Sequence, residues 1–172
     1  YGLRRPARDM CLLSRFPILD HGNSADPSIQ WARLDLGDER TLLFVNTHLS
    51  RGRFHLLRRL PIPIGYDPSR RDAQVERLRS TVEDLARTGE PVLLVGDFNM
   101  TEREPAYAEL SAGLIDSHRA LGTGPGHTWR PRTYWPLGLL RIDYMFANQH
   151  LTPLRIHSDC TPRGSDHCIV QG

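Results

Sequence analysis

The stretch Pro91-Val92-Leu93-Leu94-Val95-Gly96-Asp97-Phe98-Asn99 carries the strongest structural signal in this 172-residue chain. An apolar run after a proline, ended by a glycine, is typical of a buried strand that terminates in a tight turn. Asp97 and Asn99 follow two residues apart, so we expect both side chains to face one cleft beyond the strand end. A carboxylate beside an amide donor is suited to position a water and a phosphate oxygen.

The segments before this strand predict a β-hairpin, a loop and a helix. Two β-rich runs over 30–36 and 41–47 flank Gly37-Asp38-Glu39, and the second run is apolar on both faces, as in a covered sheet. Residues 49–66, rich in Arg, Pro and Gly, are expected to form a long loop. A helix follows, with Asp67 as its N-cap, Pro68 at its first position and an apolar face that includes Val75 and Leu78.

The segments after it complete a mixed α/β pattern. We expect a short helix over about 105–110, a loop over 117–140, and strands over 141–147 and 154–158. A turn at 164–167 then leads into an apolar strand over 168–170, and residues 10–14 form a further short strand. Strands interspersed with helices, without an internal repeat or linker, indicate one α/β domain.

Composition narrows the class of protein. A hydrophobic fraction of 39% and a mean hydropathy of −0.44 describe a soluble globular domain. Its compartment stays open, with a cytoplasmic domain and a domain attached to a missing N-terminal anchor as the two alternatives. No apolar run approaches the roughly 20 residues of a membrane-spanning helix. All 22 basic residues are Arg, which we interpret as base composition of the source genome. A net charge of +2 is too small for a protein that coats nucleic acid.

The three cysteines, Cys11, Cys160 and Cys168, predict neither a zinc site nor a disulfide framework, because they are odd in number and lack CxxC spacing. Cys11 and Cys168 lie in apolar, strand-like contexts, where a free cysteine behaves as a small hydrophobic residue. A single Cys160–Cys168 bridge is left open for an oxidising compartment.

Four polar clusters follow or interrupt the apolar strands. Each one alone is more often an ordinary strand end or turn than a functional site. Their joint occurrence in this order indicates a common site. The clusters are Asn46-Thr47-His48, Asp97-Phe98-Asn99, Arg141-Ile142-Asp143 and Ser165-Asp166-His167.

With these clusters the sequence resembles the endonuclease/exonuclease/phosphatase superfamily, which includes pancreatic deoxyribonuclease, apurinic endonucleases, neutral sphingomyelinases and inositol polyphosphate 5-phosphatases. Residues 13–18, the helix with Arg71 and Gln74, and Thr128-Trp129 support the resemblance, which covers nearly the whole chain from residue 10 on. It implies a four-layer α/β sandwich with two packed mixed β-sheets. It also implies metal-dependent hydrolysis of a phosphodiester or phosphomonoester by an activated water.

The resemblance assigns a role to each residue at the strand ends. Asp97 orients or deprotonates the attacking water, Asn99 donates to a phosphate oxygen, and His48 stabilises charge on the phosphoryl group. Asp143 hydrogen-bonds His167 and fixes its tautomer. His167 itself contacts the phosphate or transfers a proton.

The metal implied by the resemblance is Mg²⁺ or Mn²⁺, held by Asp97 and Asp166, because hard carboxylate oxygens suit these ions. The family pattern begins with a strand bearing an Asn and a strand ending in a Glu, which is the principal metal ligand. None of the residues before Met10 matches either strand. We therefore expect residues 1–172 to be a single domain lacking its N-terminal part and first strands, and the natural protein to carry this Asn and Glu upstream.

The substrate stays open between nucleic acid, phospholipid and inositol phosphate. The loops 50–66 and 119–140 are expected to flank the cleft. Trp129, Tyr134 and Trp135 either stack on a base, contact lipid, or pack under the loop. We expect a monomer without an obligate protein partner.

Two other functions compete with hydrolysis by this family. A non-catalytic member or fragment would bind a phosphorylated ligand or partner, since the principal metal ligand is absent. A calcineurin-like dinuclear metallophosphatase shares the Gly-Asp turn but requires an Asn-His cluster and several more His ligands. Here a Thr separates Asn46 from His48, and the remaining histidines are scattered.

Overall fold

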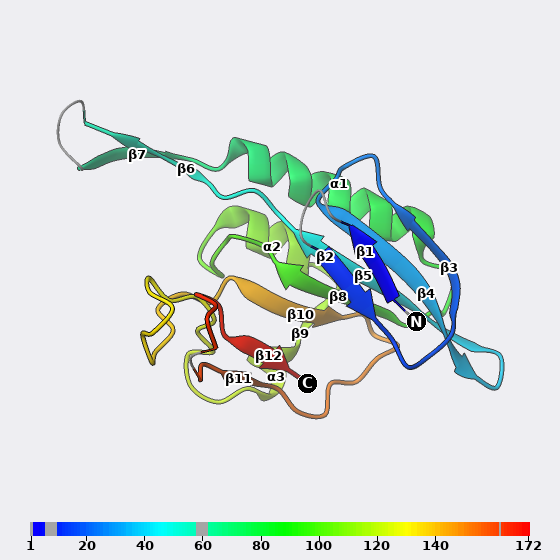
Figure 1. The fold of residues 1–172 in the computed structure, drawn as a ribbon. Helices are drawn as coiled ribbons and strands as arrows, with labels where there is room; N and C mark the ends of the chain where they lie inside the picture. The colour runs from blue at the N-terminus through cyan, green and yellow to red at the C-terminus, as the bar shows by residue number, and fades with distance from the viewer. Residues whose placement is uncertain (1, 6–9, 58–61, 162) are drawn as a thin grey trace.

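A six-stranded mixed sheet forms the centre of the computed structural model, which describes residues 2–5, 10–57, 62–161 and 163–172 (Figure 1). The strands lie in the order β3 (Ile18–Asn23), β4 (Ile29–Gly37), β5 (Arg40–His48), β8 (Val92–Asp97), β10 (Asp143–Ala147) and β9 (Ile115–Asp116). β5 and β8 are parallel, and the other neighbouring pairs are antiparallel. Parallel pairing brings the carboxyl ends of β5 and β8 to the same edge.

Helices cover one face of this sheet, where the main core lies. Leu43 and Val45 of β5 point to this face and pack in one cluster with Val75 and Leu78 of α1 (Ser69–Leu85). α2 (Pro105–Ser111) adds buried side chains to the same cluster, and α3 (Ser117–Leu121) follows β9 directly. The predicted apolar face of the first helix is confirmed.

Three two-stranded sheets complete the fold. β1 (Gly2–Arg5) pairs with β2 (Met10–Leu13), and β11 (His157–Asp159) pairs with β12 (Ile169–Gln171). Leu12 of β2 packs against Leu34 of β4, on the face opposite the helices. β6 (Arg53–Leu56) and β7 (Pro63–Asp67) form a hairpin that projects beyond the body of the molecule (Figure 1).

The predicted mixed α/β architecture is confirmed. Within the described residues, the second β-layer consists of the separate β1–β2 and β11–β12 pairs, while the absence of first strands stays a prediction. The hairpin predicted around residues 37–39 is also confirmed. Asp38 and Glu39 have φ values of 53° and 58°, as in the turns whose twist matches that of the paired strands.

Several sequence-based boundaries were wrong. The segment 49–66 is not a loop throughout, because it contains β6 and most of β7. Pro68 rather than Asp67 is the N-cap of α1, and the Asp67 carboxylate instead accepts a hydrogen bond from the Ser69 N–H at 3.0 Å. The expected loop 117–140 begins with α3, and the strand expected over 154–158 begins only at His157. Cys11 is exposed on β2 rather than buried.

None of the helices in the described part of the chain is long and apolar enough to cross a bilayer.

Candidate active site

Strand register places three predicted site residues in one row. His48 of β5 lies opposite Asp97 of β8, and Asp97 lies opposite Asp143 of β10. Residues that are paired in a sheet have their side chains on the same face. The row therefore brings one imidazole and two carboxylates together at one edge of the central sheet.

Gly96 allows β5 and β8 to approach closely just before this row. Its φ is +142°, and a Cβ atom built there would lie 1.9 Å from the carbonyl oxygen of Thr47. Every other amino acid carries that Cβ atom, so this position requires glycine. The residue that ended the predicted strand therefore also sets the spacing between His48 and Asp97.

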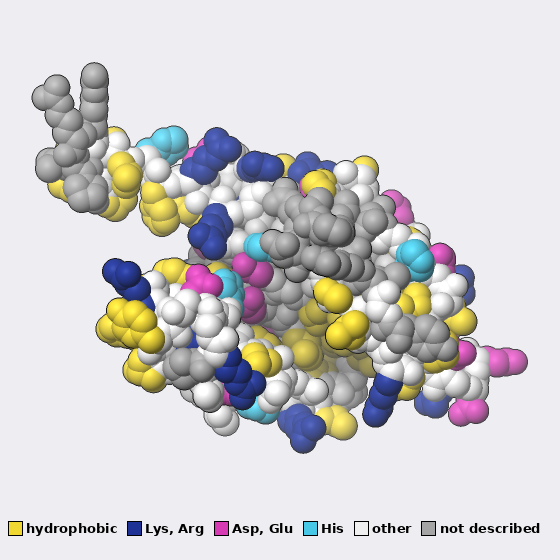
Figure 2. Space-filling model, in the orientation of Figure 1, with side chains coloured by type: hydrophobic (Ala, Val, Ile, Leu, Met, Phe, Trp, Pro, Cys, Tyr) yellow, Lys and Arg dark blue, Asp and Glu magenta, His cyan; other side chains and the backbone are white. Residues whose placement is uncertain are grey.

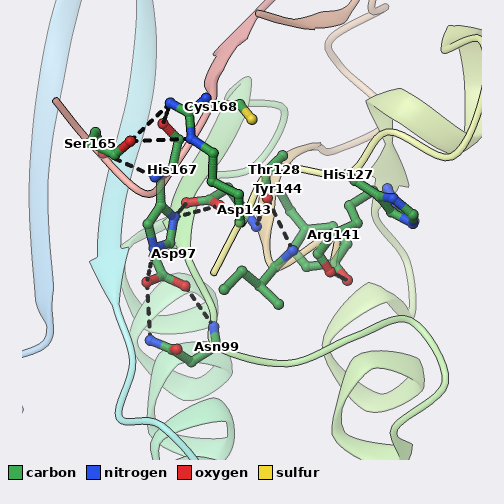
Figure 3. A network of polar contacts seen from close by, with 12 residues as sticks. Asp97, Asn99, His127, Thr128, Arg141, Asp143, Tyr144, Ser165, His167 and Cys168 are labelled. Carbon is green, nitrogen blue, oxygen red and sulfur yellow. Dashed lines mark hydrogen bonds and ion pairs between the residues drawn. The ribbon is translucent and has the colours of Figure 1, made fainter. Parts of the chain in front are cut away.

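Asn99 holds the Asp97 carboxylate in a fixed orientation (Figure 3). The Asn99 backbone N–H donates to Asp97 Oδ1 at 2.9 Å, and its Nδ2 donates to Asp97 Oδ2 at 3.0 Å and to the Leu49 carbonyl at 2.9 Å. Asn99 adopts a left-handed φ of 49°, which the Asn side chain tolerates better than most. Its donation to a phosphate oxygen stays a prediction.

The Asp97 carboxyl has a strongly perturbed pKa. Burial and the neighbouring charge of Asp143 raise the pKa of Asp97 to about 6, against the opposing hydrogen bond from Asn99 and the imidazoles of His167 and His48. Such a group exchanges its proton near neutral pH, which ordinary aspartates do not. A perturbed acid in a polar cluster is a common mark of a functional site.

His167 reaches the same carboxylate from the far side. Its Nδ1 lies 2.9 Å from Asp143 Oδ2, and its Nε2 lies 3.9 Å from Asp97 Oδ2 (Figure 3). Because an ionised carboxylate only accepts, Nδ1 carries the proton and Nε2 faces Asp97. The hydrogen bond to Asp143 raises the pKa of His167, although burial opposes it. His48 Nε2 lies 3.5 Å from the same Asp97 oxygen.

Buried Arg130 organises the segment that carries His167. It is 1% exposed and donates to the carbonyl oxygens of Trp135, Cys160 and Ser165. A disulfide between Cys160 and Cys168, the pairing left open by the sequence, closes the same segment. Sequence reasoning missed Arg130, because one arginine among 22 carries no local signal.

Helix α1 supports the other half of the site through two buried polar side chains. Arg71 donates to the Asn99 carbonyl at 2.9 Å, and Gln74 accepts from the Ser50 N–H at 2.8 Å. Gln74 also donates to Ser28 Oγ at 3.0 Å, while the Ser28 carbonyl accepts from the His48 N–H. These contacts explain why Arg71 and Gln74 accompany the strand-end clusters.

Arg141 anchors the strand that carries Asp143. It is buried, donates to both carboxylate oxygens of Asp116, at 3.0 and 2.8 Å, and pairs with Glu102. Sequence reasoning grouped Arg141 with Asp143 but did not predict these partners. Asp116 also caps α3, so one carboxylate joins β9, α3 and β10.

The residues present fit a divalent cation. Ligand atoms of Asp97, Asp143 and His167 lie within 4.8 Å of one another. The raised pKa of Asp97 reflects burial first and then the neighbouring charge of Asp143, and a cation would relieve the repulsion between the two carboxylates. Asp166 is not part of this cluster, although its charge contributes to the raised pKa of His167. Its role as a metal ligand stays a prediction.

The family model for the Endonuclease/Exonuclease/phosphatase family matches residues 1–167. The chain belongs to this family. No curated protein matches the chain. Solved structures match the chain at low sequence identity, so this similarity is evidence for the fold alone.

A Bacteroides thetaiotaomicron protein described as a mannosyl-6-phosphatase has a TM-score of 0.69 and 21% identity, over 90% of this chain and 65% of that one. Truncated TDP2 of Caenorhabditis elegans has a TM-score of 0.65 and 20% identity, over 93% of this chain and 67% of that one. Beta toxin of Staphylococcus aureus, solved with bound magnesium ions, has a TM-score of 0.61 and 17% identity, over 88% of this chain and 56% of that one. The chain spans just under two thirds of the length of the two Bacteroides thetaiotaomicron family structures.

The aromatic residues expected beside the cleft differ in position. Trp129 is half-buried and lines a cavity next to Asn99, and its backbone forms a bridge to His167. Tyr134 and Trp135 are exposed and do not pack under the loop.

Proposed function

We propose that the chain hydrolyses a phosphoester, either a phosphodiester or a phosphomonoester, by an activated water with the aid of Mg²⁺ or Mn²⁺. The observation that carries this proposal is the row of His48, Asp97 and Asp143, completed by His167. Family membership supports the coarser statement that the chain is a phosphoester hydrolase. The phosphatase among the similar structures agrees with it.

In the proposed reaction, a water oxygen attacks phosphorus, the bond to the leaving oxygen breaks, and that oxygen takes up a proton. Asp97 would orient the water and accept its proton. Asp143 holds Nδ1 of His167, so Nε2 would donate to the phosphoryl group or the leaving oxygen. His48, on the other side of Asp97, would stabilise negative charge on the non-bridging oxygens.

The cation would be held at Asp97, with Asp143 and His167 near enough to share it. When bound, such an ion neutralises charge that develops on the phosphoryl oxygens and polarises the phosphoester. Asp166 remains a further ligand that the sequence predicts.

The proposal is tested by hydrolysis of bis-p-nitrophenyl phosphate and p-nitrophenyl phosphate with Mg²⁺, Mn²⁺ or EDTA. We expect Asp97→Ala and His167→Ala each to lower kcat by about a hundredfold or more. Asp38→Asn, in the exposed β4–β5 turn, and His150→Ala, also exposed, are matched controls that should retain full activity.

Calorimetric titration with the same esters separates catalysis from binding. Ester binding without turnover, in the presence of either ion, would favour the non-catalytic alternative. Turnover that survives both site substitutions would place the reaction elsewhere on the molecule.

A further inference from the structure

An apolar cavity opens directly beside the row of site residues. Its volume is about 670 Å³, and Asn99 lies in its wall. Most of the remaining wall is apolar or aromatic: Phe54, Tyr66, Met100, Trp129, Leu140 and Ile142. Phosphate and water are poor occupants for such a wall, whereas the apolar part of an ester substrate would fill it.

The β6–β7 hairpin forms one side of this cavity and has an unpacked apolar face. Phe54 pairs with Tyr66 across the two strands, with ring centroids 5.0 Å apart. Leu56 and Ile64 of the same hairpin are 57% and 64% exposed, and Phe54 is 66% exposed. An isolated two-stranded hairpin is marginal in water, so this face needs a surface to cover it.

The segment 131–140, which we call the outer loop, contributes Leu140 to the other side of the cavity and is exposed as well. Tyr134 is 71% and Leu137 66% exposed, and Trp135, Leu139 and Leu140 add to the same apolar surface. Figure 2 shows hydrophobic side chains on both projections, on either side of a hollow in which His and acidic side chains are visible. Both projections extend to the same side of the molecule (Figure 1).

The charge of the two segments is of one sign. Neither 51–66 nor 130–140 contains Asp or Glu, although acidic residues number 20 in the whole chain. Arg51, Arg53 and Arg132 are exposed on or next to the two projections. Near an anionic bilayer each such arginine favours binding by about fivefold. Exposed leucine and isoleucine side chains beside arginines suit a lipid interface, where tyrosine and tryptophan side chains also lie.

We propose that the β6–β7 hairpin and the outer loop dock on an anionic phospholipid bilayer, and that the cavity receives the apolar part of a phosphoester lipid drawn from it. The proposed substrate class rests on the function proposed above, whereas the docking does not. Docking would place the His48–Asp97–Asp143 row at the headgroup level, because the cavity connects both projections to Asn99.

Flotation with vesicles tests the docking without any turnover. We expect the protein to float with vesicles of equimolar phosphatidylcholine and phosphatidylserine, and less with phosphatidylcholine alone or at high salt. The triple variant Leu56→Ser, Ile64→Ser, Leu137→Ser should lose at least about tenfold in vesicle partition. Leu154→Ser, which removes a side chain 87% exposed outside both projections, is the matched control and should bind normally.

Tryptophan fluorescence gives a second readout of position. Vesicles should shift the emission of the protein to shorter wavelength, and Trp135→Phe should reduce that shift, because Trp135 is exposed on the outer loop. Unfolding of the triple variant would show in its circular dichroism melt. In that case the emission shift of Trp135→Phe, compared with that of the unmodified protein, tests the docking.

Three results would overturn the docking: vesicle binding unchanged in the triple variant, binding to oligonucleotides but not to vesicles, or self-association in solution through the same face. Release of water-soluble products from phospholipid vesicles, faster than from the same lipid below its aggregation threshold, is expected for the substrate class. Vesicle binding without hydrolysis of any ester would refute the proposed function and leave docking standing. Hydrolysis of soluble esters without vesicle binding would refute the docking and leave the proposed function standing.

Discussion

At the scale of single residues, the geometry of the site depends on how closely two backbones approach. Gly96 lies opposite Thr47 in the parallel β5–β8 pair, one residue before His48 and Asp97 meet. Its φ of +142° and the 1.9 Å from a built Cβ atom to the Thr47 carbonyl oxygen exclude any side chain. The position is therefore constrained by backbone conformation and by packing at once.

Gly96→Ala is expected to lower the free energy of unfolding by about 3 kcal/mol or more, because strands β5 and β8 must separate or the Gly96 backbone must change. Urea denaturation at neutral pH measures the effect. Gly89→Ala is the control: Gly89 has φ +77° with nothing within 4 Å of a built Cβ atom, so only backbone strain of about 1 kcal/mol is added. An equal decrease in the free energy of unfolding in both variants would contradict a role for the close approach of β5 and β8.

At the residue scale, the sequence predicted those site residues whose positions follow from the direction and pairing of the strands. His48, Asp97 and Asp143 each end or begin an apolar strand, and strand pairing brings them together without further information. Buried Arg130 could not be found in the same way. It donates to the carbonyl oxygens of Cys160 and Ser165, which lie far along the chain, and a chain without lysine gives arginine no contrast.

At the scale of elements, α1 is attached to the site by a polar network as well as by its apolar face. Asp26, before β4, accepts from Ser28 Oγ at 2.6 Å, from Gln74 Nε2 at 3.3 Å and from Arg77 Nε at 2.8 Å. Burial acts to raise the pKa of Asp26, but the hydrogen bonds from Ser28, Arg77 and Gln74 outweigh it and lower the pKa to about 2.

The sign of this shift predicts acid sensitivity. Because the pKa of Asp26 is lower in the folded protein than its ordinary value of 3.8, the stabilisation is complete above that value and is lost as pH falls towards about 2. Asp26→Asn should lower stability by on the order of 2 kcal/mol at neutral pH and flatten its fall between pH 4 and pH 2. Urea denaturation over this range measures it, with Asp38→Asn as control. A slope unchanged in Asp26→Asn would refute the assignment.

The segment from Cys160 to Cys168 is a second element that carries a site residue. Its disulfide closes a short loop that includes His167, and Arg130 fixes the backbone within it. In the chain-entropy view, removing such a crosslink costs about 2–3 kcal/mol. We expect Cys160→Ser with Cys168→Ser to lower the melting temperature by several degrees and to make the protein insensitive to dithiothreitol. Equal melting of the oxidised and reduced unmodified protein would contradict this.

Element boundaries could be predicted where apolar strands were separated by a clear turn, and not where the residue types and the burial pattern pointed to different structures. The β4–β5 hairpin has apolar strands and a clear turn, and its turn residues 38 and 39 have the positive φ values that such turns need. The β6–β7 hairpin has a proline, a glycine and an arginine within strands whose apolar face is unpacked. Its sequence therefore lacks the burial pattern from which strands are recognised.

At the scale of the whole molecule, the site concentrates negative charge that the rest of the chain balances. The net charge of the chain is +2, yet Asp97 and Asp143 face each other across neighbouring strands in a half-buried setting. Burial, together with the repulsion from Asp143, raises the pKa of Asp97. A ligand that neutralises this pair binds only the folded protein, so its binding stabilises the whole domain.

Mg²⁺ or Mn²⁺ at millimolar concentration is therefore expected to raise the melting temperature of the protein. Saturation to a hundred times the dissociation constant would add about 2.7 kcal/mol, or several degrees for a domain of this size. EDTA should remove the shift, and Asp97→Asn should abolish it even if that variant is itself more stable, because the amide lacks the charge. Asp38→Asn, which removes an exposed carboxylate of the β4–β5 turn, should keep the full shift. A shift that persists in Asp97→Asn would place the cation outside the His48–Asp97–Asp143 row.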